Sequence, residues 1–234
     1  MRRLISSSLS RRRLVAALAL APVVASGLAR RTLAAGAAVP ISSEAARQRL
    51  VAGNGRYVSG QPLRLDHSRR RETVAHGQMP FAIVLGCSDS RVPPEILFDQ
   101  GLGDIFTVRV AGNIADDLAI GSMEYAVDHF GTPLIVVLGH ERCGAVSATV
   151  ESVAAGTMPP PHIASLVAAL RPAVEASKGM PGDAVENAIT THVRRTVEAL
   201  RASGPILGDA VARGRLEIVG AEYHLASGRV GFLA

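Results

Sequence analysis

Three short segments of the chain are rich in apolar residues. In chain order they are Phe81–Gly86, Asp104–Val110 and Leu134–Gly139; the first and third show no alternation of polar and apolar positions, whereas the second is more mixed. Strands that are buried on both faces have this pattern, because side chains of both orientations then need apolar partners. We therefore predict three strands of a mostly parallel sheet.

Between and after these runs, apolar residues recur at helical spacing, and Gly or Pro marks many of the segment ends. A helix beginning at Ser42 is expected to place Leu50, Val51, Asn54 and Val58 on one face. Strands that alternate with helices indicate an α/β fold, with a mostly parallel central β-sheet flanked by helices. The predicted helices are Ser42–Val58, a short one ending at His76, Pro93–Phe98, Asp116–Phe130 (ended by Gly131), Ala145–Ala155, 162–177, 182–202 and 205–213, followed by a hairpin of Leu216–Glu222 and Arg229–Leu233.

The first and third apolar runs each end in Gly followed by polar side chains that favour metal ions. Cys87 follows the first run, and His140 and Cys143 follow the third. Ligands bind beyond the carboxyl ends of parallel strands, so adjacent strands would bring these loops together. Thiolate and imidazole are preferred ligands of zinc, and three protein ligands leave a position open for catalysis. A free thiol, a structural role or a disulfide is the alternative for the two cysteines.

Asp89 and Arg91 lie in the same loop as Cys87 and leave two arrangements open. Asp89 could be a fourth ligand that closes the site. It could instead pair with Arg91 and accept a hydrogen bond from a zinc-bound water, with Arg91 keeping it ionised and away from the metal. A simple salt bridge within the loop is the third possibility.

Charge along the chain is concentrated at its beginning. The net charge is +5, but residues 1–37 contain seven arginines and no acidic residue, which leaves 18 basic and 20 acidic residues in 38–234. No basic patch in that remainder suggests a nucleic-acid partner. We therefore treat 1–37 as a separate segment and 38–234 as the folded domain.

Residues 1–37 have the layout of an export signal. A basic region ends at Arg13, the apolar segment Leu14–Ala25 follows, and Ala35-Gly36-Ala37 fits a cleavage site. Ser10-Arg11-Arg12-Arg13 followed by Leu and Val resembles a twin-arginine signal. We expect a periplasmic or secreted protein with no stable membrane span after processing. The alternatives are an uncleaved anchor or a disordered tail on a cytoplasmic protein.

The motifs together resemble one enzyme family. CSDSRVPPE at 87–95 and GHERCGAV at 139–146 are similar to the paired C-x-D-x-R and H-x-x-C motifs of the β-class carbonic anhydrases, in the plant-like subgroup. Further similarity lies in FDQGLGDIF at 98–106, VRVAGNI at 108–114 and GSMEYAVDHFG at 121–131. The resemblance implies the β-carbonic anhydrase fold and reversible hydration of CO₂ to bicarbonate and a proton by zinc-bound hydroxide. It also implies one Zn²⁺ per chain and a homodimer or tetramer with the active site near the dimer interface.

The resemblance also implies a role for each matching residue. Cys87, His140 and Cys143 match the zinc ligands, and Asp89 and Arg91 match the catalytic dyad. The expected substrate-binding residues are the amide of Gln78, the aromatic rings of Phe106 and Tyr125, and the backbone N–H of Gly144.

Two departures from the family concern the pocket. Ala111 stands where the plant-like pattern has valine, which loosens the pocket wall. The bicarbonate-inhibited subgroup has a tryptophan where this chain has Val84, although its later arginine is matched by Arg109. We therefore expect no non-catalytic bicarbonate site.

Other functions remain open at this stage. Hydrolysis of carbonyl sulfide or carbon disulfide at the same zinc is one, and a non-catalytic zinc-binding protein is another. A phosphatase loop is excluded because Pro93 occupies the position that requires arginine, and a C-x-x-C redox pair is absent. The other six histidines, His192 among them, show no ligand spacing and are expected at the surface or at helix ends.

Overall fold

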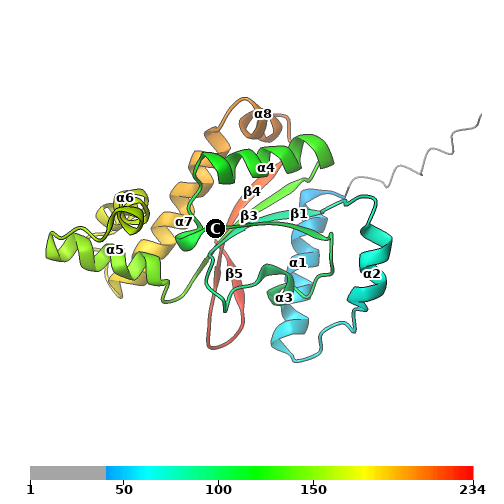
Figure 1. The fold of residues 1–234 in the computed structure, drawn as a ribbon, viewed down its shortest axis with the longest axis horizontal. Helices are drawn as coiled ribbons and strands as arrows, with labels where there is room; N and C mark the ends of the chain where they lie inside the picture. The colour runs from blue at the N-terminus through cyan, green and yellow to red at the C-terminus, as the bar shows by residue number, and fades with distance from the viewer. Residues whose placement is uncertain (1–40, 234) are drawn as a thin grey trace, which may run out of the picture. The chain divides into compact units, whose positions relative to one another are not determined.

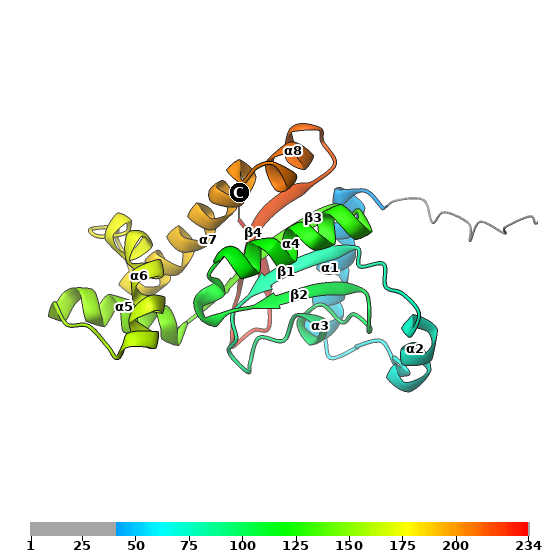
Figure 2. The same ribbon diagram turned by 45° about the horizontal axis from the view of Figure 1, so that its top comes forward.

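The computed structural model describes residues 41–233, and the predicted export signal lies outside them. Five strands form one sheet in the order β2-β1-β3-β4-β5 (Figures 1 and 2). The pairings among β1 to β4 are parallel, and only β5 runs antiparallel to its neighbour. The strands are β1 (Ala82–Gly86), β2 (Ile105–Arg109), β3 (Leu134–His140), β4 (Glu217–Tyr223) and β5 (Val230–Phe232).

The helices confirm the predicted alternation, with ends that differ from the expected ones by one or two residues. They are α1 (Ser43–Val58), α2 (His67–Val74), α3 (Pro94–Leu97), α4 (Asp117–Phe130), α5 (Gly144–Ala155), α6 (Pro161–Ala176), α7 (Ala184–Ala202) and α8 (Ile206–Ala212), with a 3₁₀ turn η1 at Ala111–Asn113. Ser42 caps α1 as expected, since its side chain accepts a hydrogen bond from the N–H of Ala45. Gly131 ends α4 in the left-handed conformation, with φ of 64°.

Helices cover both faces of the sheet (Figures 1 and 2). Ala82 and Val84 of β1 pack in one cluster with α1 and α3, whereas Ile83 and Leu85 pack in another with α4, α7 and α8. Every residue of β1 and β3 is buried. The absence of alternation in these two strands therefore follows from their position between two helical layers.

A third cluster lies beyond the carboxyl ends of the strands. It joins Cys87 and Cys143 to apolar residues of α5, α6 and α7. In Figure 2, α5 and α6 lie past the end of the sheet, and the segment after β3 leads directly into α5. The residues expected from the sequence to carry the chemistry thus lie beyond the carboxyl ends of the strands, beside α5, α6 and α7.

The face that the sequence predicts for α1 is only partly buried. Leu50 and Asn54 of α1 are buried, but Val51 is half exposed, so the buried face is narrower than the predicted one. Tyr125 of α4 is also about half exposed and stacks on His129. Among the described residues, no helix has both the length and the apolar character needed to cross a membrane.

Candidate metal centre

The topology brings the two predicted ligand loops together. β1 and β3 are parallel neighbours, with Gly86 in register with Leu138. Cys87 directly follows β1, His140 is the last residue of β3, and Cys143 is the N-cap of α5. His140 thus projects from the end of a strand, whereas Cys143 stands at the start of a helix. Arg142 between them is left-handed, with φ of 51°, which turns the chain sharply from strand to helix.

The three side chains form a compact, buried group. Their ligand atoms all lie within 4.8 Å of one another, and the two sulfurs are 4.0 Å apart. Two thiolates about 2.3 Å from a tetrahedral zinc ion would be separated by roughly 3.8 Å. Within residues 41–233, no other group of three potential ligands converges in this way. The spacing therefore fits zinc.

The hydrogen bonding of the His140 ring leaves its Nε2 free to bind a cation. Its Nδ1 lies 2.9 Å from the carbonyl oxygen of Glu141, and because a carbonyl only accepts, Nδ1 carries the proton. Nε2 is buried and has no hydrogen-bond partner. A buried nitrogen with a free lone pair is costly unless something binds it, so the missing partner fits a metal ion.

The protonation of Cys87 and Cys143 also favours a bound metal ion. A hydrogen bond from the Cys143 thiol, aided by His140 and by the N–H groups of Asp89 and Gly112, lowers the pKa of Cys87 to about 4, although burial opposes this. The same hydrogen bond, together with burial, raises the pKa of Cys143. The pair loses one proton easily and retains the second. A divalent cation would replace that second proton and balance the charge of both thiolates.

Asp89 and Arg91 lie in one hydrogen-bonded turn beside the thiols. The Val92 N–H donates to the Asp89 carbonyl at 3.0 Å, and the Arg91 N–H donates to Asp89 Oδ1 at 2.9 Å. The guanidinium of Arg91 donates to both carboxylate oxygens, at 2.9 and 2.7 Å. These bonds, with the charge of nearby His140, hold the pKa of Asp89 well below its usual range. Asp89 is therefore ionised and engaged by Arg91.

Gly144 lies at the first position of α5, next to the ligand Cys143. A Cβ built on it would meet nothing within 4 Å, so space is open beside its backbone. Its N–H is among the first-turn donors that a helix cannot satisfy internally. The sequence-predicted role, a donor to an oxygen atom near the metal, is compatible with this position.

The other predicted substrate-binding residues are not brought to the metal group within one chain. Gln78 is exposed, lies before β1, and lines a hollow with Phe130, at the opposite end of the strand from Cys87. The rings of Phe106 and Tyr125 lie 6.5 Å apart, on β2 and α4. These residues gather along the β2 edge of the sheet.

Three residues near the site were given no role from the sequence. Gly112 donates its N–H to Cys87 Sγ at 3.2 Å, and Arg109 donates to two carbonyls of the ligand loop. His192 is wrongly predicted, because it is buried in the middle of α7 with Nε2 unpartnered. Its helical spacing from Ala188 and Ile189, both buried, could have revealed this.

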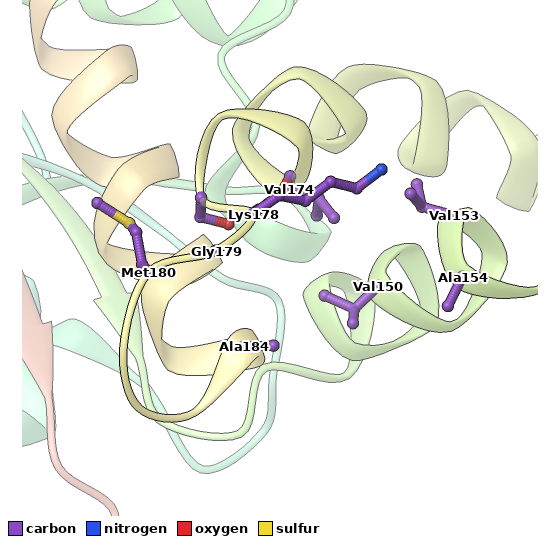
Figure 3. Close-up of a pocket in the computed structure, with 9 residues that line it drawn as sticks. Val150, Val153, Ala154, Val174, Lys178, Gly179, Met180 and Ala184 are labelled. Atoms are coloured by element: carbon purple, nitrogen blue, oxygen red, sulfur yellow. Dashed lines mark hydrogen bonds between the residues drawn. The ribbon is translucent and has the colours of Figure 1, made fainter.

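A separate apolar cavity of about 250 Å³ lies between α5 and the loop that joins α6 to α7 (Figure 3). Val150 and Val153 of α5 line one wall, and the aliphatic chain of Lys178 extends along the other. None of the three metal-group residues lines it. The cavity is therefore distinct from the metal centre.

Known proteins are similar to this chain in both sequence and fold. The carbonic anhydrase family model matches residues 82–230. A carbonic anhydrase of Mycolicibacterium smegmatis is 43% identical over 80% of this chain and 91% of its own length. Carbonic anhydrase 2 of Mycobacterium tuberculosis is 42% identical over 79% and 90%, respectively. A solved Coccomyxa β-carbonic anhydrase in complex with acetazolamide superposes with a TM-score of 0.62, at 30% identity over 71% of this chain and 77% of that one.

Proposed function

The chain belongs to the β-carbonic anhydrase family and hydrates CO₂, and on that premise we propose how its residues carry out the reaction. One Zn²⁺ would be held by Cys87 Sγ, Cys143 Sγ and His140 Nε2. The convergence of these atoms within 4.8 Å, beside the Asp89–Arg91 pair, is the observation that carries the proposal. When bound, zinc lowers the pKa of water and so supplies a nucleophile near neutral pH.

Asp89 orients the attacking water. Its carboxylate is ionised and can accept a proton of that water in a hydrogen bond, which directs an oxygen lone pair toward CO₂. Arg91 keeps the carboxylate ionised and at a fixed angle through its two parallel bonds. The dyad therefore acts by positioning a proton acceptor rather than by binding the substrate.

Gly144 stabilises the product as charge develops on it. Its N–H stands at the N-terminus of α5, where the helix dipole favours negative charge. A donor placed there before the reaction lowers the cost of forming bicarbonate. The apolar cluster behind the ligands, which includes Ile114, Val146 and Ile189, keeps water from the other side of the centre.

The residues on the β2 edge reach a site through a second copy of the chain. β2 has a neighbour on one side only, so it can pair with another strand. If two copies paired antiparallel across this edge, the N-terminal end of each β2 would lie beside the C-terminal end of the other. Gln78, Phe106 and Tyr125 of one chain would then approach the metal ligands of its partner. The exposure of Gln78 and Tyr125 supports this assembly.

Residues 1–37 direct export, with residues 38–234 as the working domain. The basic region, the apolar segment and the twin-arginine pattern support this proposal. Fractionation of cells that express the full chain tests it. A zinc-loaded protein found mainly in the periplasm or medium is expected, and an unprocessed protein confined to the cytoplasm would contradict the proposal.

Stopped-flow CO₂ hydration by the zinc-loaded full chain tests the reaction and the role of Asp89. The variant Asp89→Asn is expected to lower kcat by roughly 100-fold, as loss of a proton acceptor does. The matched control is Asp209→Asn, which removes an exposed carboxylate also paired with an arginine, and it should leave the rate unchanged. Full activity of Asp89→Asn would exclude the proposed role. A chain with one zinc and no hydration activity would contradict the reaction itself.

A further inference from the structure

Arg109 makes a contact that the mechanism above does not use. Its Nε donates to the backbone carbonyl of Cys87 at 2.9 Å, and its Nη2 donates to that of Asp89 at 2.6 Å. One planar guanidinium thus binds two carbonyls of the same loop. Because the guanidinium donors have a rigid fork geometry, the two bonds fix the separation of these carbonyls.

The position of Arg109 follows from strand register. Arg109 is the last residue of β2 and is paired with Gly86, the last residue of β1. Next to it, the Val110 N–H donates to the Gly86 carbonyl at 3.1 Å, and the Gly112 N–H donates to Cys87 Sγ at 3.2 Å. The segment 109–112 therefore lies along the loop that starts at Gly86 and supports it at successive points.

Asp89 is bound from two sides by two different arginines. Arg91 binds its carboxylate, but Arg91 belongs to the same turn and would move with Asp89 if the turn moved. Arg109 binds its backbone carbonyl and belongs to another strand of the sheet. Of these two side chains, only Arg109 ties the turn to the sheet. Arg91 therefore sets the charge and angle of the carboxylate, whereas Arg109 sets where the turn stands relative to Cys87.

We propose that Arg109 is a positioning residue that keeps the Asp89 carboxylate from becoming a fourth ligand of the metal. Asp89 lies two residues from Cys87 in the same loop, so a shift of the turn toward the thiols would make its carboxylate a potential fourth ligand. The two bonds from Arg109 prevent that shift. The inference rests on the proposed zinc site, and it adds a residue that touches neither metal nor substrate and acts by holding the backbone of Asp89 and Cys87.

Methionine at position 109 keeps most of the length of the side chain and removes both donors. In the zinc-loaded full chain, Arg109→Met should lower kcat/KM by about 10- to 100-fold, the usual range for second-sphere residues. Arg109→Lys retains one donor and should recover part of the loss. The matched control is Arg201→Met, since Arg201 also donates two bonds to a backbone carbonyl, that of Ile218, away from the metal centre. It should leave kcat/KM unchanged.

Cobalt substitution supplies a readout that is independent of activity. If Asp89 enters the coordination sphere in Arg109→Met, the visible absorption of the Co²⁺-loaded chain should change from that of the unsubstituted chain. In an Asp89→Asn background, Arg109→Met should then have no effect on the absorption, because the group through which it acts is gone. If Arg109→Met does not accumulate as a folded protein, Arg109→Lys is judged by the same comparison.

Two results would overturn the proposal. One is an unchanged cobalt spectrum together with kcat/KM within about threefold of the unsubstituted chain. The other is a spectral change that persists in the Asp89→Asn background, since Arg109 would then act on Cys87 itself. Failure of the proposed function is separable, because it would appear as an unsubstituted chain that binds metal and lacks hydration activity.

Discussion

Substituting Gly112 by alanine should weaken zinc binding, although Gly112 is not itself one of the three metal ligands. Gly112 has φ of 70°, and a Cβ there would lie 3.0 Å from Leu170 Cδ1 and 3.3 Å from Ala145 Cβ. The left-handed conformation costs an alanine about 1–2 kcal/mol, and crowding in a packed region adds about 1–3 kcal/mol. Because Leu170 is buried and has little room to move, we expect part of the relief to come from a shift of η1 that lengthens the bond from the Gly112 N–H to Cys87 Sγ.

That shift changes the competition between protons and metal at Cys87. The Gly112 N–H is one of the groups that lower the pKa of Cys87, so its withdrawal raises that pKa. A thiol with a higher pKa gives up its proton to zinc less readily, and the difference grows as pH falls. We expect zinc affinity to fall by roughly 10- to 100-fold at neutral pH, as is usual for the loss of a second-sphere hydrogen bond.

Gly131→Ala is the matched control. Gly131 has a similar φ of 64°, but a Cβ there meets nothing within 4 Å, and the residue ends α4 away from the metal centre. Competition with a chromophoric chelator measures zinc affinity, and urea unfolding of the metal-free chain measures stability. Gly131→Ala should lose about 1–2 kcal/mol of stability and no zinc affinity. Equal zinc dissociation constants for the two variants would refute the reasoning.

Two further predictions concern stability. Burial lowers the pKa of His192, so as pH falls below about 6.5 the unfolded chain takes up a proton first and stability is lost. The free energy of unfolding, measured with urea between pH 7 and 5, should therefore fall less steeply with pH in His192→Gln than in the unsubstituted chain, by up to about 1.4 kcal/mol per pH unit. Equal slopes for the two chains would count against a buried neutral ring. The Asn54 side chain donates to the carbonyls of Leu97 and Gly228 and accepts from the Val230 N–H. Asn54→Ala should cost about 2–4 kcal/mol, against about 0.5–1 for Asn187→Ala, whose two bonds to backbone carbonyls are exposed to solvent, and equal unfolding midpoints would show that the Asn54 bonds contribute little.

The strands and the ligand set could be predicted from sequence for a physical reason. β1 and β3 are buried on both faces, so their apolar runs are unbroken and easily recognised. The side chains that follow them are chemically specific, because few functions other than metal binding need two thiols and an imidazole at adjacent strand ends. Placing Cys87, His140 and Cys143 in one site therefore required only the assumption that the two strands are neighbours.

The supporting residues could not be predicted in this way. The role of Arg109 depends on its register with Gly86, and a side chain's partners across a sheet are not encoded in its local pattern. The prediction of an exposed His192 is wrong because it relies on the polar residue type alone. Its position in α7 places it on the same buried face as Ile189 and Val193. Gln78 was expected at the site, but within one chain it lies at the far end of β1.

The residues that support the ligand loop and those expected to bind substrate both lie along the β2 edge of the sheet. The residues that support Cys87 and Asp89 come from the end of this strand, which has a single neighbour in the sheet. An edge strand is held by half the ladder of an interior one, so it is the part of the sheet that local opening displaces most readily. The metal ligands, by contrast, are themselves buried and stand at the ends of the buried strands β1 and β3 and at the N-cap of α5. The ligands are thus fixed by the core, whereas the carboxylate that orients water depends on an edge. A second copy paired along β2 would stiffen that edge, and the same contact would supply Gln78, Phe106 and Tyr125 to the partner's site.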